Sequence, residues 1–143
     1  LQGDWSSDVC SSDLYGPSDF ILPSKDQPQT TEHTDGNVYR LLGKPVTGNE
    51  DLAKLASPAW HVTSDPLSTP PLVTFHGDKD RTVLQNQSQR IRDLYQSLNR
   101  PVELHIIAGG EHGGPKFHTP AVHEQIVQFL NTHFRDPLPS PAP

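Results

Sequence analysis

The sequence predicts an α/β fold with parallel strands, because short apolar runs alternate with stretches of helical periodicity in its second half. The run at residues 72–75 is short, continuous and apolar, which is typical of a strand in a sheet that is buried on both faces. Residues 102–107 alternate and then become apolar, which indicates a second strand. A helical stripe follows each run, so the order strand, helix, strand, helix predicts parallel strands joined by right-handed crossovers.

The two helical stripes of this half have apolar residues three and four positions apart. The first consists of Ile91, Leu94, Tyr95 and Leu98. Asn99 and Pro101 then end that helix, because the residue before a proline avoids the α region. The second stripe consists of Val122, Ile126, Phe129, Leu130 and Phe134.

Two short helices are expected before the first of these strands. Residues 37–42 can form one helix, which Gly43 stops. Asn49 is a good N-cap for the next helix, and Pro58 ends it. The apolar side of this second helix would consist of Leu52, Leu55 and Ala56. The polar stretch 23–36 has no periodicity, and we interpret it as a loop or part of a lid.

Composition narrows the functional classes. The chain of 143 residues is long enough for one domain, but its 32% hydrophobic content is low and its 15 prolines indicate many loops. A net charge of −6 with scattered basic residues argues against a nucleic-acid partner. No apolar run approaches the roughly 20 residues that a membrane span requires. The single cysteine, Cys10, excludes an internal disulfide framework, and the compartment stays open.

The N-terminal tract GDWSSDVCSSDL at residues 3–14 shows neither helical nor strand periodicity. Residues 4–14 resemble a translated sequencing-library adapter, and the alternative is a natural Ser-rich leader. We therefore assign residues 1–14 to an artefactual or disordered leader and residues 15–135 to the folded part. The proline-rich residues 136–143 are expected to be a disordered tail.

A carboxylate and an imidazole follow the two predicted strands. Asp80 lies a few residues beyond the first strand and His112 a few residues beyond the second. Because the carboxyl ends of parallel strands meet at one edge of a sheet, we expect these two side chains to lie within hydrogen-bonding reach. A carboxylate bonded to one ring nitrogen fixes the imidazole tautomer and stabilises the imidazolium. Asp78 is the competing carboxylate, and its place in a tight turn favours a structural role.

Each residue of the pair, taken alone, has a simpler structural explanation, and their joint occurrence after consecutive strands favours a catalytic pair. The glycines that flank the histidine can adopt the backbone angles that expose it: Gly109, Gly110, Gly113 and Gly114. Glu111 is expected to be a solvated loop charge, while His76 and His105 are expected to be structural. For Tyr15 and Trp60, packing is a simpler role than lining a substrate pocket.

No metal or cofactor is expected. His118 and His123 are five positions apart, one more than the spacing that puts two ligands on one helix face. The chain has no H-E-x-x-H pattern and no clustered carboxylates.

Five segments together resemble the C-terminal half of the α/β-hydrolase superfamily, in its acetyl-esterase, feruloyl-esterase and prolyl-oligopeptidase-like branches. They are YGPSD at 15–19, LASPAWHV at 55–62, HGDKDRTV at 76–83, QS at 87–88 and GGEHGG at 109–114. The resemblance implies that Asp80 is the acid and His112 the general base of a Ser-Asp-His triad. The Gly-x-Ser-x-Gly elbow of the nucleophile is missing, and Ser18 and Ser88 lack its glycines.

The resemblance implies an incomplete α/β-hydrolase fold from a serine hydrolase that cleaves small-molecule carboxylic esters. We expect the chain alone to be inactive, because its nucleophile would lie upstream. Two alternatives stay open, a prolyl-oligopeptidase-like peptidase and a non-catalytic interaction module with a hydrolase fold. The acyl and alcohol groups of the substrate and the oligomeric state cannot be predicted.

Overall fold

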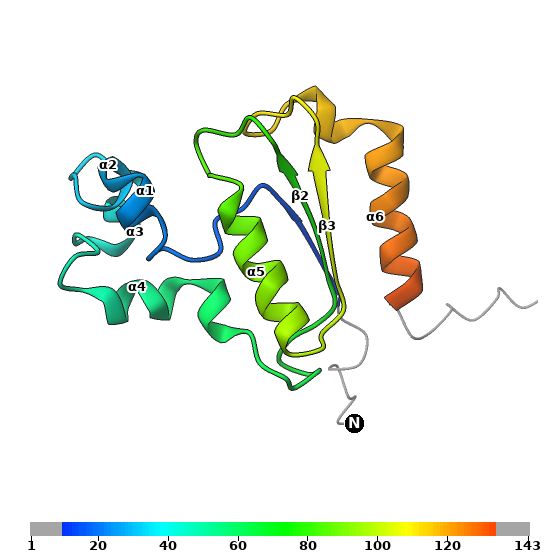
Figure 1. Ribbon diagram of the computed structural model, residues 1–143, viewed down its shortest axis with the longest axis horizontal. Helices are drawn as coiled ribbons and strands as arrows, with labels where there is room; N and C mark the ends of the chain where they lie inside the picture. The colour runs from blue at the N-terminus through cyan, green and yellow to red at the C-terminus, as the bar shows by residue number, and fades with distance from the viewer. Residues whose placement is uncertain (1–9, 134–143) are drawn as a thin grey trace, which may run out of the picture.

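The computed structural model describes residues 10–133, and a parallel three-stranded sheet lies at its centre (Figure 1). The strands β1 (Ser11–Leu14), β2 (Leu72–Gly77) and β3 (Val102–Ile107) run in the order β1-β2-β3. Leu72 pairs with Ser11 on one side and with Val102 on the other. The prediction of a parallel α/β fold is confirmed.

All residues of β2 are buried, because it has a neighbouring strand on each side and a helix on each face. Successive side chains of a strand point to opposite faces. Val73 and Phe75 pack into a core with residues that include Val122 and Phe129 of α6 (Pro120–His133). Thr74 and His76 face α5 (Asn86–Ser97) and contact Ser88 at its start. The two predicted helical stripes therefore cover opposite faces of the sheet, and Phe134 lies outside the described residues.

Short helices between β1 and β2 lie beside the sheet, on the side away from α6 (Figure 1). They are α1 (Pro23–Asp26), α2 (Pro28–Thr31), α3 (Asn37–Leu42), α4 (Glu50–Ala56) and the 3-10 helix η1 (Pro58–His61). A second core of Phe20, Val38, Val46 and Ala53 joins α3 and α4 to the segments around Phe20 and Val46. Another 3-10 helix, η2 (Pro115–His118), precedes α6.

The helical segments before β2 confirm two expectations and correct two. α3 ends at Gly43, whose φ of 70° is left-handed, and α4 begins after Asn49. The stretch 23–36, expected to be a loop or lid, contains α1 and α2. Each starts with a proline, whose fixed φ suits the first position of a helix.

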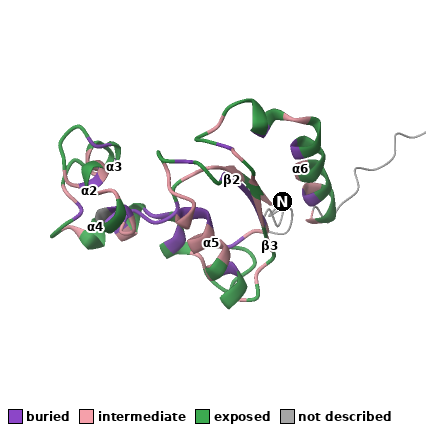
Figure 2. Cartoon of the chain, turned by 45° about the horizontal axis from the view of Figure 1, so that its top comes forward, coloured by how far each residue is buried: buried purple, intermediate pink, exposed green. Residues whose placement is uncertain are grey.

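The predicted apolar side of α4 was wrong. Leu55 is 70% exposed, whereas Ala53 is completely buried, and Figure 2 shows how much of this helix faces solvent. Ala53 belongs to the second core, so this residue lies on the inward side of α4, and Leu52, Leu55 and Ala56 lie on its exposed side. Asn49 occupies the N-cap position, yet its side-chain amide donates to the carbonyl of Pro45 instead of capping the helix.

The expectation of no regular structure up to residue 14 was wrong for Ser11–Leu14, which form β1. Main-chain bonds hold this strand, from Ser11 N to Pro71 O at 2.8 Å and from Tyr15 N to Phe75 O at 2.8 Å. The adapter-like origin of the tract stays a prediction, because a strand paired through its main chain accepts many sequences. Residues 1–9 and the expected tail at 136–143 lie outside the described part. No helix between residues 10 and 133 has the length and apolar character of a membrane span.

Candidate active site

The loop after β2 (residues 78–85, the acid loop) and the loop after β3 (residues 108–114, the histidine loop) meet at the carboxyl edge of the sheet. Two glycines set the distance between these loops. A Cβ on Gly77 would lie 2.3 Å from the carbonyl oxygen of Gly110, far inside any tolerable contact. Lys79 N donates to the same carbonyl at 2.8 Å. The glycines thus let the backbones of the two loops touch, which brings Asp80 to His112.

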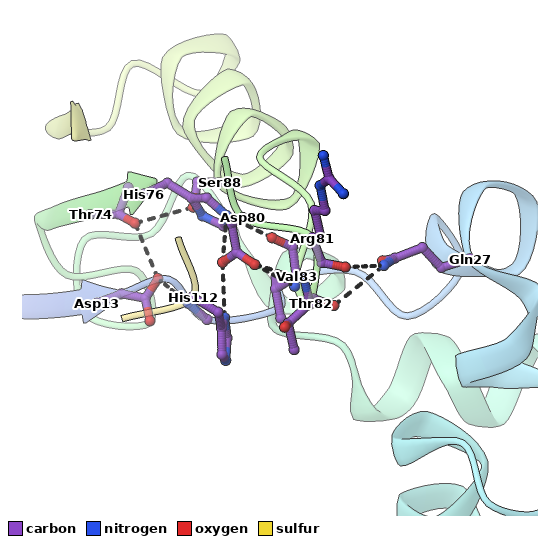
Figure 3. A network of polar contacts seen from close by, with 11 residues as sticks. Asp13, Gln27, Thr74, His76, Asp80, Arg81, Thr82, Val83, Ser88 and His112 are labelled. Carbon is purple, nitrogen blue, oxygen red and sulfur yellow. Dashed lines mark hydrogen bonds and ion pairs between the residues drawn. The ribbon is translucent and has the colours of Figure 1, made fainter. Parts of the chain in front are cut away.

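Asp80 is the hydrogen-bonding centre of this edge, and its side chain is completely buried. Its Oδ2 accepts a hydrogen bond from His112 Nδ1 at 2.9 Å (Figure 3). Its Oδ1 accepts bonds from Thr82 N at 2.8 Å and Val83 N at 2.9 Å. Three donors therefore hold the carboxylate in one orientation, and the contact with His112 leaves the other ring nitrogen, Nε2, available as a base.

His112 is exposed, with 36% of its side chain accessible. Within residues 10–133, Nε2 of this histidine has no hydrogen-bond partner. The ring makes an edge contact with Tyr15, with centroids 4.9 Å apart at 65°. Gly113 lies against the same tyrosine and has a φ of 84°, which a residue with a side chain rarely adopts. The arrangement presents a tautomerically fixed imidazole to solvent, where it can accept and return a proton.

Asp78, the competing carboxylate, is exposed and turns away from the imidazole. Its Oδ1 accepts a bond from Gly109 N at 2.7 Å, which ties the acid loop to the histidine loop. The structure thus brings His112 to Asp80 and leaves Asp78 in a turn. The flanking glycines contribute in different ways, since Gly109, Gly113 and Gly114 have positive φ and Gly110 provides the close approach.

Beneath the pair lies His76, which is completely buried at the end of β2. Its Nε2 is 2.8 Å from the carbonyl oxygen of Val83 and 3.4 Å from Asp80 Oδ2. Its Nδ1 is 2.7 Å from Ser88 Oγ. Because a carbonyl can only accept, the proton resides on Nε2, and Nδ1 accepts from the Ser88 hydroxyl. His76 is therefore a structural residue that supports the acid loop from below.

The two serines considered as nucleophiles are both structural. Ser18 is buried, and its hydroxyl donates to the carbonyl of Gln87 at 2.6 Å. The Ser88 hydroxyl donates to Nδ1 of His76 at 2.7 Å. Gln87 also accepts from Ser18 N at 2.9 Å and from Asp19 N at 2.8 Å, so it fixes the YGPSD loop to α5. No hydroxyl or thiol in the described chain is bonded to His112. Sequence reasoning missed the role of Gln87, although the QS segment of the resemblance was the available signal.

The remaining candidates have structural surroundings. His105 stacks on Phe75 with centroids 4.8 Å apart, and Tyr15 packs against the core of the sheet. Trp60 is 47% exposed and lies under the ammonium group of Lys54. The rings of His118 and His123 are 6.3 Å apart. No group of three or more His, Cys, Asp or Glu side chains that could hold a metal ion occurs within residues 10–133.

A cavity of about 230 Å³ opens beside His112. Its walls come from the acid loop, the YGPSD loop and the helices α1 to α3. The imidazole therefore lies where a shaped apolar space meets a polar, open groove along the acid and histidine loops.

Solved structures with a similar fold include a truncated carbohydrate esterase from gut microbiota, with a TM-score of 0.72, 22% identity and 87% of this chain covered. A puromycin-hydrolysing peptidase of Mycobacterium tuberculosis has a TM-score of 0.66 and 22% identity, over 88% of this chain. Esterase 2 of Thermogutta terrifontis has a TM-score of 0.61 and 19% identity, over 90%. The match covers 42%, 18% and 44% of those chains, so this chain spans less than half of each.

These likenesses confirm the hydrolase fold, since each neighbour is a hydrolase in which the strands and helices of this chain recur. No curated protein matches the sequence. The BD-FAE family model matches residues 9–95, which is more than half of the chain and includes the acid loop with Asp80. The chain therefore belongs to the BD-FAE family, a hydrolase family of the α/β-hydrolase type.

Proposed function

We propose that this chain supplies the acid and the base of a serine hydrolase that cleaves carboxylic esters, with Asp80 as the acid and His112 as the base. The nucleophilic serine would come from sequence outside this chain. The observation that supports this proposal most strongly is the 2.9 Å hydrogen bond between His112 Nδ1 and the completely buried carboxylate of Asp80. Within the described residues, this bond leaves Nε2 of His112 without a hydrogen-bond partner. The esterases among the structural neighbours favour the same chemistry.

In the proposed reaction, Nε2 of His112 takes the proton of the serine hydroxyl as the oxygen attacks the ester carbonyl. The tetrahedral intermediate collapses, the bond to the alkoxy oxygen breaks, and His112 returns the proton to the departing alcohol. Water then attacks the acyl-enzyme while His112 removes its proton, and the carboxylic acid leaves as the proton passes back to serine. Asp80 stabilises the imidazolium in both halves.

A peptidase is the second candidate, because one structural neighbour is a peptidase that hydrolyses puromycin. His112, oriented by Asp80, would then return the proton to a departing amine instead of an alcohol. Matched ester and amide substrates with the same acyl group distinguish the two.

The test uses the full-length protein and p-nitrophenyl acetate. We expect His112→Ala to lower kcat by roughly 10^6, as loss of the base does in a well-studied serine hydrolase. His118→Ala is the matched control, because His118 is exposed on η2 and has no bond to Asp80. Equal turnover by His112→Ala and the wild type would refute the proposal. A wild-type protein that hydrolyses neither the ester nor the matched amide substrate would support the alternative of a non-catalytic interaction module.

A further inference from the structure

The cavity beside His112 has a mostly apolar wall. Val38 and Leu41 of α3 form one side of it, Phe20 contributes from directly after the YGPSD loop, and Val83 contributes from the acid loop. Its other lining side chains are prolines and uncharged polar residues. Among the described residues that line it, His112 is the one titratable side chain.

The absence of charge in this lining restricts what the cavity can bind. Within residues 10–133, no carboxylate, lysine or arginine lines it, so a charged group would lose its hydration without gaining a partner from this part of the chain. An uncharged apolar group would instead exchange water for contact with the apolar wall. Leu41 is 64% exposed at this wall, which leaves apolar surface that an occupant would cover.

The volume restricts the occupant further. Cavities that hold whole drug-sized ligands measure roughly 300–1,000 Å³. At about 230 Å³ this cavity is smaller, so it fits one short group of a larger molecule. Because His112 lies in its wall, that group would be attached directly to the reacting ester.

The far wall is fixed relative to the imidazole by polar contacts between the small helices and the sheet. Gln27 Nε2 donates to the carbonyl of Arg81 in the acid loop at 2.9 Å (Figure 3). Asn86 at the start of α5 donates to Asp26 Oδ2 at 2.7 Å. These contacts fix the distance between the small helices and the acid loop. A site that selects a substrate group by its length requires such a fixed distance.

We propose that this cavity is a subsite for a short, uncharged, apolar group of the substrate ester, and that Leu41 sets the length it accepts. The inference rests on the proposed function and deepens it. The group can be carried by the acyl or by the alcohol part of the ester, since both lie next to the reacting carbonyl.

Binding is tested first, with 2-hexanone as an uncharged ester mimic and hexanoate as its charged counterpart. In the full-length protein with labelled leucine and valine methyl groups, 2-hexanone should shift the NMR signals of Val38 and Leu41, and hexanoate should not. Leu41→Trp should weaken 2-hexanone binding by about tenfold or more, the effect of a small steric change in an apolar pocket. Leu55→Trp is the matched control, because Leu55 is an equally exposed leucine of α4 outside the cavity. Unmoved Val38 signals, or equal binding of hexanoate, would overturn the inference.

Turnover is tested second, in two ester series that extend either the acyl chain or the alcohol from two to six carbons. Leu41→Trp should lower the ratio of kcat/KM for the longest to the shortest ester in one series, which identifies the part that enters the cavity. Leu41→Ala should raise that ratio, and Leu55→Trp should not change it. Unchanged ratios in both series for both Leu41 variants would overturn the inference. If the wild type hydrolyses no ester but 2-hexanone binds as described, the proposed function fails and the apolar subsite stands.

Discussion

At the scale of single residues, Asp80 has more hydrogen-bond donors than a surface carboxylate of a turn would collect. Two backbone amides hold one of its oxygens, and the imidazole of His112 is bonded to the other. In a buried setting such bonds are stronger than in water, and they keep the carboxylate from rotating. The orientation of His112 therefore depends on the backbone of the acid loop as much as on its partner side chain.

Asp80→Asn should lower kcat of the full-length protein by about 10^4 with little change in fold, because an amide can bond to the wrong imidazole tautomer. Asp78→Asn should cost less than about tenfold, because Asp78 is bonded to Gly109 N and not to His112. Both rates are measured with p-nitrophenyl acetate. Equal losses in the two variants would show that the acid has been assigned to the wrong carboxylate.

His76→Phe should destabilise the full-length protein by about 1–3 kcal/mol, since the Val83 carbonyl loses its bond from His76 and the Ser88 hydroxyl keeps only its 3.4 Å contact with Thr74. His105→Phe is the control, because His105 is bonded only to the half-exposed Glu103 and should cost less than about 1 kcal/mol. Urea unfolding measures both. A His76 variant as stable as the control would contradict the supporting role of this histidine.

At the scale of elements, the sequence predicted the parts whose periodicity matches their burial. α5 and α6 repeat apolar residues at helical spacing and bury that stripe, and β2 is a continuous apolar run that is buried on both faces. β3 departs from its alternating pattern, because Ile106 is 43% exposed. The helices α1 and α2 are each one turn long, too short for a periodic signal. β1 was missed for another reason, since its SSDL sequence has no apolar alternation and the edge of β2 holds it.

The candidate site likewise has contacts that the sequence predicts and contacts that it does not predict. Asp80 and His112 were predicted as neighbours because strand ends in a parallel sheet converge, a consequence of topology alone. The contact of Gln87 with the YGPSD loop joins residues 69 positions apart in the chain. The cavity likewise depends on α3, which reaches the acid loop only through tertiary packing. No local pattern encodes such contacts.

Gly77→Ala should destabilise the full-length protein by about 1–3 kcal/mol and also lower its activity, because the new methyl group would push the Gly110 backbone and with it the histidine loop. Gly48→Ala is the control. Its φ of 79° makes the substitution cost about 1–2 kcal/mol, yet nothing lies within 4 Å of its added methyl group. Activity measured well below the unfolding transition should fall only in the first variant. A fully active Gly77→Ala protein would show that the loops are not coupled through this contact.

At the scale of the whole molecule, the described sheet has two edge strands, β1 and β3, and unpaired strand edges favour aggregation. Several large apolar side chains are also exposed, among them Leu41, Leu55, Leu67, Ile106 and Val127. The solved relatives are more than twice as long as the aligned part of this chain. In the larger protein proposed above, further chain would cover these surfaces.

The 143-residue chain, expressed alone, should therefore be prone to aggregate and should not hydrolyse p-nitrophenyl acetate above background. The expected loss of rate is large, because a missing nucleophile alone costs roughly 10^6 in kcat. Size-exclusion chromatography, a thermal scan and the esterase assay measure the three properties. A soluble monomer with a cooperative transition would contradict the first expectation, and turnover that disappears in His112→Ala would contradict the second.

The contact between Gly77 and Gly110 also has a consequence for how such proteins can diverge. Surface loops usually tolerate insertions and deletions independently of one another. Here an added residue between Gly77 and Asp80, or between Gly110 and His112, would separate the carboxylate from the imidazole even if both side chains were kept. Among homologues, the lengths of these two short spacers should therefore vary much less than the lengths of the segments that connect the helices.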